Sequence, residues 1–128
     1  MNKYEKFITD LTDNTESGVA AWQLAEPGDT KGIFRGETFI FRQYECSWSP
    51  KPETTIYFVE KQVPEYIEEH NITIKDSEYE LAVVDEHGKL IFLIDRTYVS
   101  YKTLYDLNSV IEQHTKEASD FFSDYEDD

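Results

Sequence analysis

Residue types that could carry chemistry are present in this chain, but they are scattered. Among 128 residues there is one cysteine, Cys46, and three histidines, His70, His87 and His114. Nucleophilic hydrolysis needs a serine, threonine or cysteine held beside a base, with an oxyanion site that is usually a strained glycine-rich turn. Cys46 follows Glu45, whose charge raises the pKa of a thiol, and no motif ties it to a histidine. The sequence therefore predicts no catalytic residues and favours a buried, structural Cys46.

Residues that could bind a metal ion are scattered in the same way. A zinc site typically uses two histidines one turn apart or a cysteine pair, and neither spacing occurs. The acid-rich clusters 68–70 and 85–87 each include a histidine, but Asp and Glu are the usual residues of solvated surface turns. We therefore predict no metal and no cofactor. The least favoured of three hypotheses is a small metal-dependent hydrolase that uses Glu68, Glu69, His70, Glu86 or His87.

The charge of the chain is strongly negative. It carries 27 acidic and 12 basic residues, a net charge of −15, and residues 65–128 hold 17 of the acids and 5 of the bases. Such a field repels nucleic-acid phosphates and anionic lipid and attracts basic protein surfaces. No apolar run is long enough to cross a bilayer. We expect a basic protein partner, no direct nucleic-acid or membrane binding, and, with a single cysteine, a cytoplasmic location.

The acids near the C-terminus are arranged regularly. Asp120, Asp124 and Asp128 repeat every four residues, a spacing at which like charges destabilise a helix. They also lie toward the negative end of the helix macrodipole, so stability does not account for them. Displayed to a basic groove, such acids would roughly imitate nucleic-acid phosphates. The alternative is that residues 124–128 are a frayed, solvated tail. The predicted partner-binding residues are Asp106, Glu117, Asp120, Asp124 and Asp128.

Helical periodicity occurs at both ends of the chain. Apolar residues at positions 4, 7, 8 and 11 predict a helix over 2–13 that Asn2 caps and that ends before Gly18. From Leu104 to Tyr125 the same spacing predicts one helix of about six turns, with Ser100 or Thr103 as its cap. Its last apolar residues, 121, 122 and 125, extend past what a small sheet can cover, which suggests a homodimer.

Between the helices the hydrophobic period is two, which is typical of strands with one buried face. Strands are predicted at 19–24, 33–35, 38–48, 54–63, 79–84 and 90–94, with a tight turn at Gly36-Glu37. Trp22 is expected in the core. Residues 64–78 fit neither period, so they are predicted to form a long connection that could contain a short strand or a helical turn. Pro64 ends a strand or marks an edge.

These elements predict an α+β fold in which an antiparallel meander of five to six strands carries the N-terminal helix and a long C-terminal helix. No linker divides the chain, so residues 1–128 are expected to form a single domain.

Short motifs along the chain strengthen this order of elements. Leu11, Thr15 and Gly18 precede Trp22, a turn follows at 85–89, and Leu-Tyr opens the segment 104–107. In these features the chain resembles a set of small uncharacterised bacterial and phage-borne α+β proteins. The resemblance implies the order helix, meander, helix. It implies no activity, cofactor or site residue.

The leading hypothesis is therefore a non-enzymatic acidic module that binds a basic protein, as an inhibitor or an immunity or anti-defence protein does. The alternative is a structural or oligomerising domain whose aromatic face forms the contact and whose charge keeps it soluble.

Overall fold

The computed structural model describes residues 2–30, 32–34, 39–70 and 72–125. Its elements follow the predicted order of helix, antiparallel sheet and C-terminal helices, so the α+β fold class is confirmed. The predicted turn at Gly36-Glu37 lies outside the described residues.

The first helix, α1, spans Lys3–Glu16. Its N-cap is the predicted Asn2, whose side-chain oxygen accepts a hydrogen bond from the backbone N–H of Glu5 at 2.7 Å. This bond satisfies one of the donors that the start of a helix leaves without an intrahelical partner. Beyond the helix Gly18 adopts a φ of +83°, which glycine tolerates because it has no Cβ. The chain can therefore turn sharply into the sheet.

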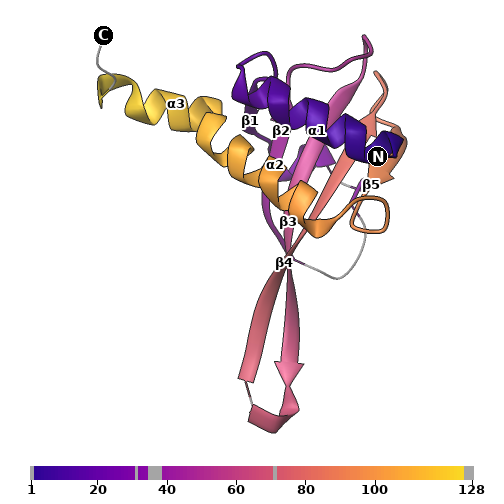
Figure 1. The fold of residues 1–128 in the computed structure, drawn as a ribbon, viewed down its shortest axis with the longest axis vertical. Coiled ribbons are helices and arrows are strands. Elements are labelled where there is room, and N and C mark those ends of the chain that lie inside the picture. The colour runs from indigo at the N-terminus through magenta and orange to yellow at the C-terminus, as the bar shows by residue number, and fades with distance from the viewer. Residues whose placement is uncertain (1, 31, 35–38, 71, 126–128) are drawn as a thin grey trace.

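The sheet is an antiparallel meander in which each strand pairs with its neighbour in sequence, in the order β1-β2-β3-β4-β5. The five strands of the described residues agree with the predicted five to six. Figure 1 shows the meander with the helices in front of it. The strands are β1 Trp22–Leu24, β2 Phe39–Cys46, β3 Thr55–Ile67, β4 Ile72–Val84 and β5 Leu90–Ile94.

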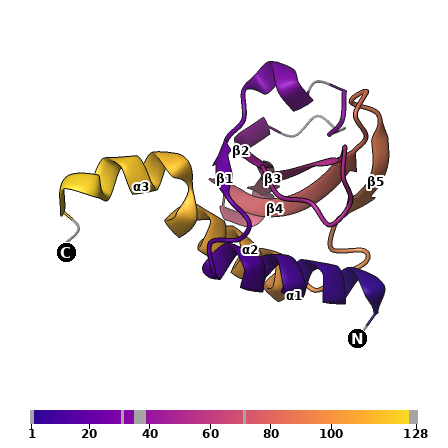
Figure 2. The same ribbon diagram turned by 90° about the horizontal axis from the view of Figure 1, so that it is seen from above.

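One face of the sheet is covered by α1 and by α2, which spans Tyr101–His114 and is capped by Ser100 as predicted. Figure 2 shows both helices on the same side of the sheet. Each large apolar side chain buried between these layers contributes about 1.5–3 kcal/mol. The fully buried ones include Ile8, Leu11, Ile56, Phe58, Leu81, Ile94, Leu104, Leu107 and Ile111.

A polar contact locks β1 to α1 within this core. The indole Nε1 of Trp22 donates to Oγ1 of Thr15 at 2.9 Å, and that hydroxyl donates to the carbonyl of Leu11 at 2.7 Å. Trp22 is 1% exposed and Thr15 is fully buried, so the prediction that Trp22 belongs to the core is confirmed. Leu11, Thr15 and Trp22, which belong to the motifs of the family resemblance, are thus linked by hydrogen bonds.

The opposite face of the sheet is covered by the segment that precedes β2. A short 3-10 helix, η1, spans Pro27–Thr30, and Ile33 then packs against Tyr57, Ala82 and Val84. The prediction of a strand at 33–35 is wrong for its two described residues, which lie in a turn and a bend. The apolar residues there cover the second face instead of extending the sheet.

The prediction of a long connection over 64–78 is wrong for most of the segment, although the helical turn allowed within it is present. β3 continues to Ile67 and pairs with β4 as far as Ile72, and the 3-10 helix η2, Glu68–His70, joins them. Among the described residues the pairing with β2 ends at Gln62, so within that part of the chain β3 is an edge strand beyond it. An edge tolerates Pro64, which lacks a donor, in agreement with the second of its two predicted roles.

The C-terminal segment is not one helix. α2 ends at His114, and Thr115 is extended, with φ −70° and ψ 154°. Its backbone forms a parallel bridge with Trp22, and its hydroxyl accepts from the N–H of Ala118 at 3.1 Å, which caps the next helix, α3. The pairing with β1 and the cap outweigh continuation of the helix. His114, which falls on the apolar stripe of the predicted single helix, is exposed.

Candidate functional site

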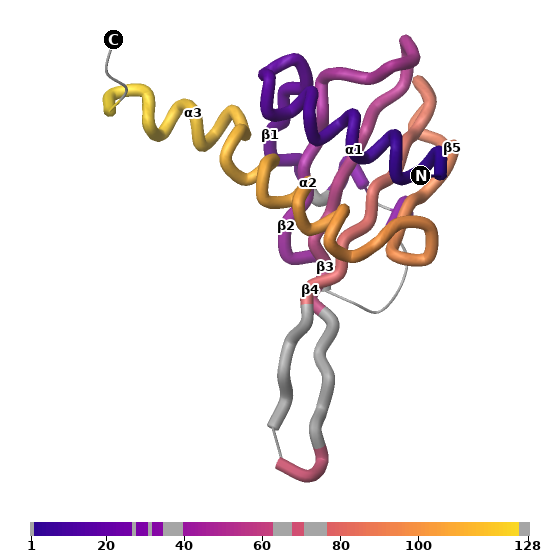
Figure 3. Tube along the Cα trace, in the orientation of Figure 1, coloured from indigo at the N-terminus to yellow at the C-terminus, as the bar shows by residue number. Residues whose placement is uncertain are grey.

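The segment after Thr115 leads away from the body of the protein. α3 spans Lys116–Phe122 and the 3-10 helix η3 spans Ser123–Tyr125. Figure 3, like Figures 1 and 2, shows α1 and α2 side by side while α3 extends past them. At its base Glu117 Oε1 accepts from the backbone N–H of Leu24 at 2.7 Å. The direction of α3 is therefore fixed at its first turn, whereas none of its residues is buried.

Three aromatic rings lie exposed on this projection. Phe121 is 72% exposed, Phe122 54% and Tyr125 77%. Their rings touch in sequence, with centroids 4.9 Å apart for the first pair and 6.4 Å for the second. Single exposed apolar residues are ordinary, but a contiguous cluster marks an interaction surface. We call this cluster with its flanking acids the α3 surface: Asp120, Phe121, Phe122, Asp124 and Tyr125.

The five predicted contact acids have different surroundings. Asp106 lies on α2 and pairs with Lys102 at 2.8 Å, and Glu117 is occupied by the backbone of Leu24. Asp120 and Asp124 are exposed, and within the described residues neither carboxylate forms an ion pair or hydrogen bond. Asp128 lies outside the described residues. The break at Thr115 divides the expected stripe, so the acids of α3 and η3 form a separate group from Asp106.

The candidate nucleophile is not accessible. Cys46 is 3% exposed in β2, and burial raises the pKa of its thiol to about 11. A thiol that stays protonated and buried is a poor nucleophile. The position agrees with the predicted structural role of Cys46.

The residues of the hydrolase hypothesis do not form one site. Glu68, Glu69 and His70 are exposed in η2, before β4, whereas Glu86 and His87 lie in the turn after β4. The thirteen residues of β4 separate the two groups by about 40 Å at 3.3 Å per residue. Among the described residues no group of three or more His, Cys, Asp and Glu side chains is placed to hold a metal ion.

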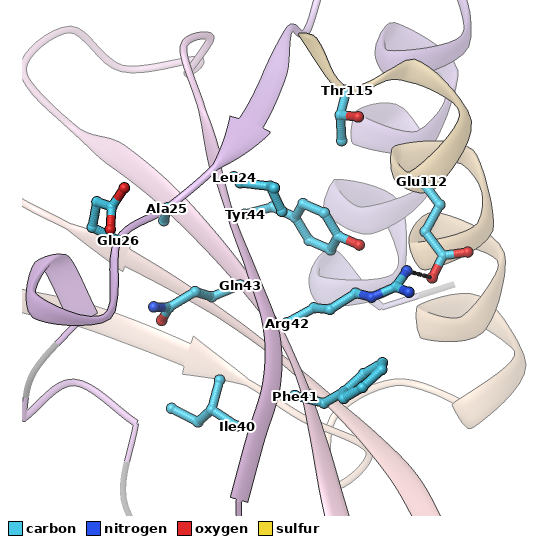
Figure 4. A pocket seen from close by; sticks show the side chains of 10 residues that line it. All are labelled: Leu24, Ala25, Glu26, Ile40, Phe41, Arg42, Gln43, Tyr44, Glu112 and Thr115. Carbon is cyan, nitrogen blue, oxygen red and sulfur yellow. Dashed lines mark hydrogen bonds and ion pairs between the residues drawn. The ribbon is translucent and has the colours of Figure 1, made fainter. Parts of the chain in front are cut away.

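A second feature is a cavity of about 640 Å³ at the outer edge of β2, shown in Figure 4. Arg42 and Tyr44 reach into it from β2 on the side of the helices, where they face Glu112 of α2. Ile40 and Gln43 extend to the other side of the same strand. The cavity therefore wraps around an edge of the sheet.

Electrostatic contacts hold the helix side of this cavity. The Arg42 guanidinium lies 3.1 Å from Glu112 Oε1, and Asn108 Nδ2 donates to the same oxygen at 3.2 Å. A hydrogen bond to Tyr44 raises the pKa of Arg42. Burial raises the pKa of Tyr44, and the neighbouring Arg42 partly opposes this shift. The guanidinium and the phenol thus stay protonated at neutral pH.

Sequence reasoning did not identify this cavity. Glu112 follows Asn108 by four residues and precedes Thr115 by three, so these polar residues share a helix face beside the apolar stripe. That spacing was the sequence feature that indicated a polar face on α2. Nothing in the sequence indicated that the face would lie opposite Arg42, because that depends on how α2 crosses the sheet.

Within the described part of the chain, no helix has both the length and the apolar character needed to cross a membrane. Comparison of the chain with protein-family models, with curated proteins and with solved structures gives no match.

Proposed function

We propose that this protein is a non-enzymatic acidic module that binds a basic protein partner through the α3 surface, as an inhibitor or an immunity or anti-defence protein does. The observation that supports this most is the display of three clustered aromatic rings beside Asp120 and Asp124 on a projecting segment. A few residues, among them many aromatic ones, supply most of the binding energy in protein interfaces, and charges steer the encounter and select the partner.

The chemistry of the α3 surface defines the partner. Phe121, Phe122 and Tyr125 need an apolar groove, which a short amphipathic helix can enter with one face. Asp120 and Asp124 need lysine or arginine at the rim of that groove. The net charge of −15 adds long-range attraction to any basic surface and makes association sensitive to salt. A protein whose groove normally holds nucleic acid would offer both features.

The experiment compares three baits in a pull-down from the native host at low salt. The variant Asp120→Asn/Asp124→Asn should capture less of the principal basic partner than wild type does. The control Asp10→Asn/Asp13→Asn removes the same charge from two exposed positions of α1 and should bind as wild type does.

The captured partner is then purified and titrated. Two exposed ion pairs contribute about 0.2–1 kcal/mol each, so the double variant of α3 should bind roughly 2- to 30-fold more weakly. Its melting temperature should not fall, because a repulsive pair at an i, i+4 spacing is removed. Equal affinity of the two double variants would show that the α3 surface is not the contact.

A second candidate function is homo-oligomerisation, in which the aromatic rings of the α3 surface pack against a second copy. The exposed apolar residues of the edge strand β5, Leu90, Ile91 and Phe92, favour it further, because exposed apolar edges attract other strands. Sedimentation at two protein concentrations and two salt concentrations separates the candidates. A dimer that persists in high salt would favour oligomerisation, and a monomer would favour the basic partner.

A further inference from the structure

The edge of β2 is a second exposed feature, separate from the α3 surface. β1 is only three residues long and pairs with Tyr44–Cys46. One more contact, from the N–H of Ala25 to the carbonyl of Gln43 at 3.0 Å, follows before the chain leaves as η1. Among the described residues, the outer side of β2 from Ile40 to Arg42 has no neighbouring strand. Such an edge presents backbone donors and acceptors to an incoming strand.

The cavity at this edge has the shape that an added strand requires. Its lining comes from both faces of the sheet, with Arg42, Tyr44 and Glu112 on one side and Ile40 and Gln43 on the other (Figure 4). Successive side chains of an extended peptide point to opposite faces, so a peptide beside β2 would place them alternately on the two sides. A strand-adding ligand gains affinity from its backbone and specificity from such alternating pockets.

A β-bulge makes this edge selective. The register with β3 shifts between Ile40 and Arg42, so Phe41 is the extra residue. Phe41 is 43% exposed, and the Arg42 guanidinium lies 4.9 Å from the centre of its ring. A bulge twists an edge away from unspecific pairing and re-aims a side chain. Phe41 therefore forms an apolar platform at the mouth of the cavity for a peptide that fits the bulge.

The charges at the rim select the ligand. Arg42 and Asn108 both contact Oε1 of Glu112, so its Oε2 can accept from an incoming cation. Glu26 is exposed at the end of β1 and also lines the cavity. A second copy of this chain also carries a net charge of −15, so the two copies would repel each other at this edge. The complementary ligand carries lysine or arginine.

From this geometry we infer that β2 binds an extended, basic peptide segment of another protein, which adds a strand beside Ile40–Arg42 and places lysine or arginine side chains against Glu112 and Glu26. The peptide continues the line of β1 along the sheet edge. This site uses none of the residues of the α3 surface.

The test uses the full chain and a synthetic peptide, Ac-Lys-Val-Lys-Val-Lys-Val-NH2, followed by NMR of the backbone amides. Addition of the peptide should shift the amides of Ile40, Phe41 and Arg42 in a saturable way. Two further peptides carry N-methyl groups on alternate backbone nitrogens, one on the odd positions and one on the even positions. Each loses the N–H donors along one edge of the extended peptide and keeps its charge. At least one methylated peptide should bind severalfold more weakly, because it can no longer donate backbone hydrogen bonds to the edge of β2.

Two protein variants complete the design. Glu112→Gln should weaken binding of the unmethylated peptide about two- to fivefold, the range of a partly exposed ion pair. Asp120→Asn/Asp124→Asn should leave it unchanged, so failure at this edge is distinguished from failure of the α3 surface. Equal binding of all three peptides, shifts confined to α3, or no binding at millimolar peptide would overturn the inference.

Discussion

Replacing Thr115 by valine should loosen α3 without destabilising the fold. The variant keeps the shape of the side chain but removes the hydroxyl that accepts from the N–H of Ala118 at 3.1 Å. Loss of an N-cap typically costs about 1 kcal/mol. α3 has seven residues, none of them buried, so neither its length nor its packing replaces the lost contact. A change of 1 kcal/mol corresponds to about a fivefold change in the opening equilibrium of the helix.

Amide hydrogen exchange measured by NMR gives this change directly. The N–H groups of Ala118 and Ser119, which bond to the hydroxyl and the carbonyl of Thr115, should exchange about fivefold faster in Thr115→Val. Thr115→Ser retains the hydroxyl and should exchange as wild type does. The urea midpoint of global unfolding should be nearly equal in Thr115→Val and wild type, because none of the side chains of α3 is buried.

Equal exchange at these two amides in Thr115→Val and wild type would refute this prediction, and so would a loss of global stability in the valine variant as large as that of a core mutant. Either result would mean that the bridge between Thr115 and Trp22, and not the cap, fixes α3. The same variant also tests whether the order of α3 contributes to partner binding. A partner that binds ordered α3 should bind Thr115→Val more weakly than Thr115→Ser, because ordering the helix then costs binding energy.

Two further predictions concern the core. Thr15→Val leaves the buried Trp22 Nε1 without its acceptor, so the free energy of unfolding in urea should fall by about 1–3 kcal/mol; a loss of the same size in a Trp22→Phe background would disprove the coupling. Burial raises the pKa of the Cys46 thiol to about 11, above that of the unfolded thiol, so the unfolded state ionises first. The contribution of Cys46 to stability should therefore be fully present below pH 8 and decline as pH rises toward 11. In urea titrations at each pH, the free energy of unfolding of Cys46→Ala should decline less over this range than that of wild type. Identical pH profiles of the two proteins would contradict this.

The sequence alone determined the local elements of this protein. The helical stripe of 4, 7, 8 and 11 with Asn2 before it, and the alternation around the 85–88 turn, correspond to α1 and to the hairpin of β4 and β5. These patterns succeed because burial of one face requires a period of 3.6 or 2 whatever the rest of the chain does. The exposed aromatic residues of α3 were likewise visible, since they outnumber what a small sheet can cover.

Tertiary contacts decided the rest. A continuous helical period across 104–125 gave no sign of the break at Thr115, because the competing interaction is a bridge to Trp22, distant in sequence. The cavity beside Arg42 depends on β1 ending early and on α2 placing Glu112 above β2. Local sequence encodes which residues are apolar and at what period. Contacts between segments distant in sequence depend on how the layers pack, and the candidate sites lie at such contacts.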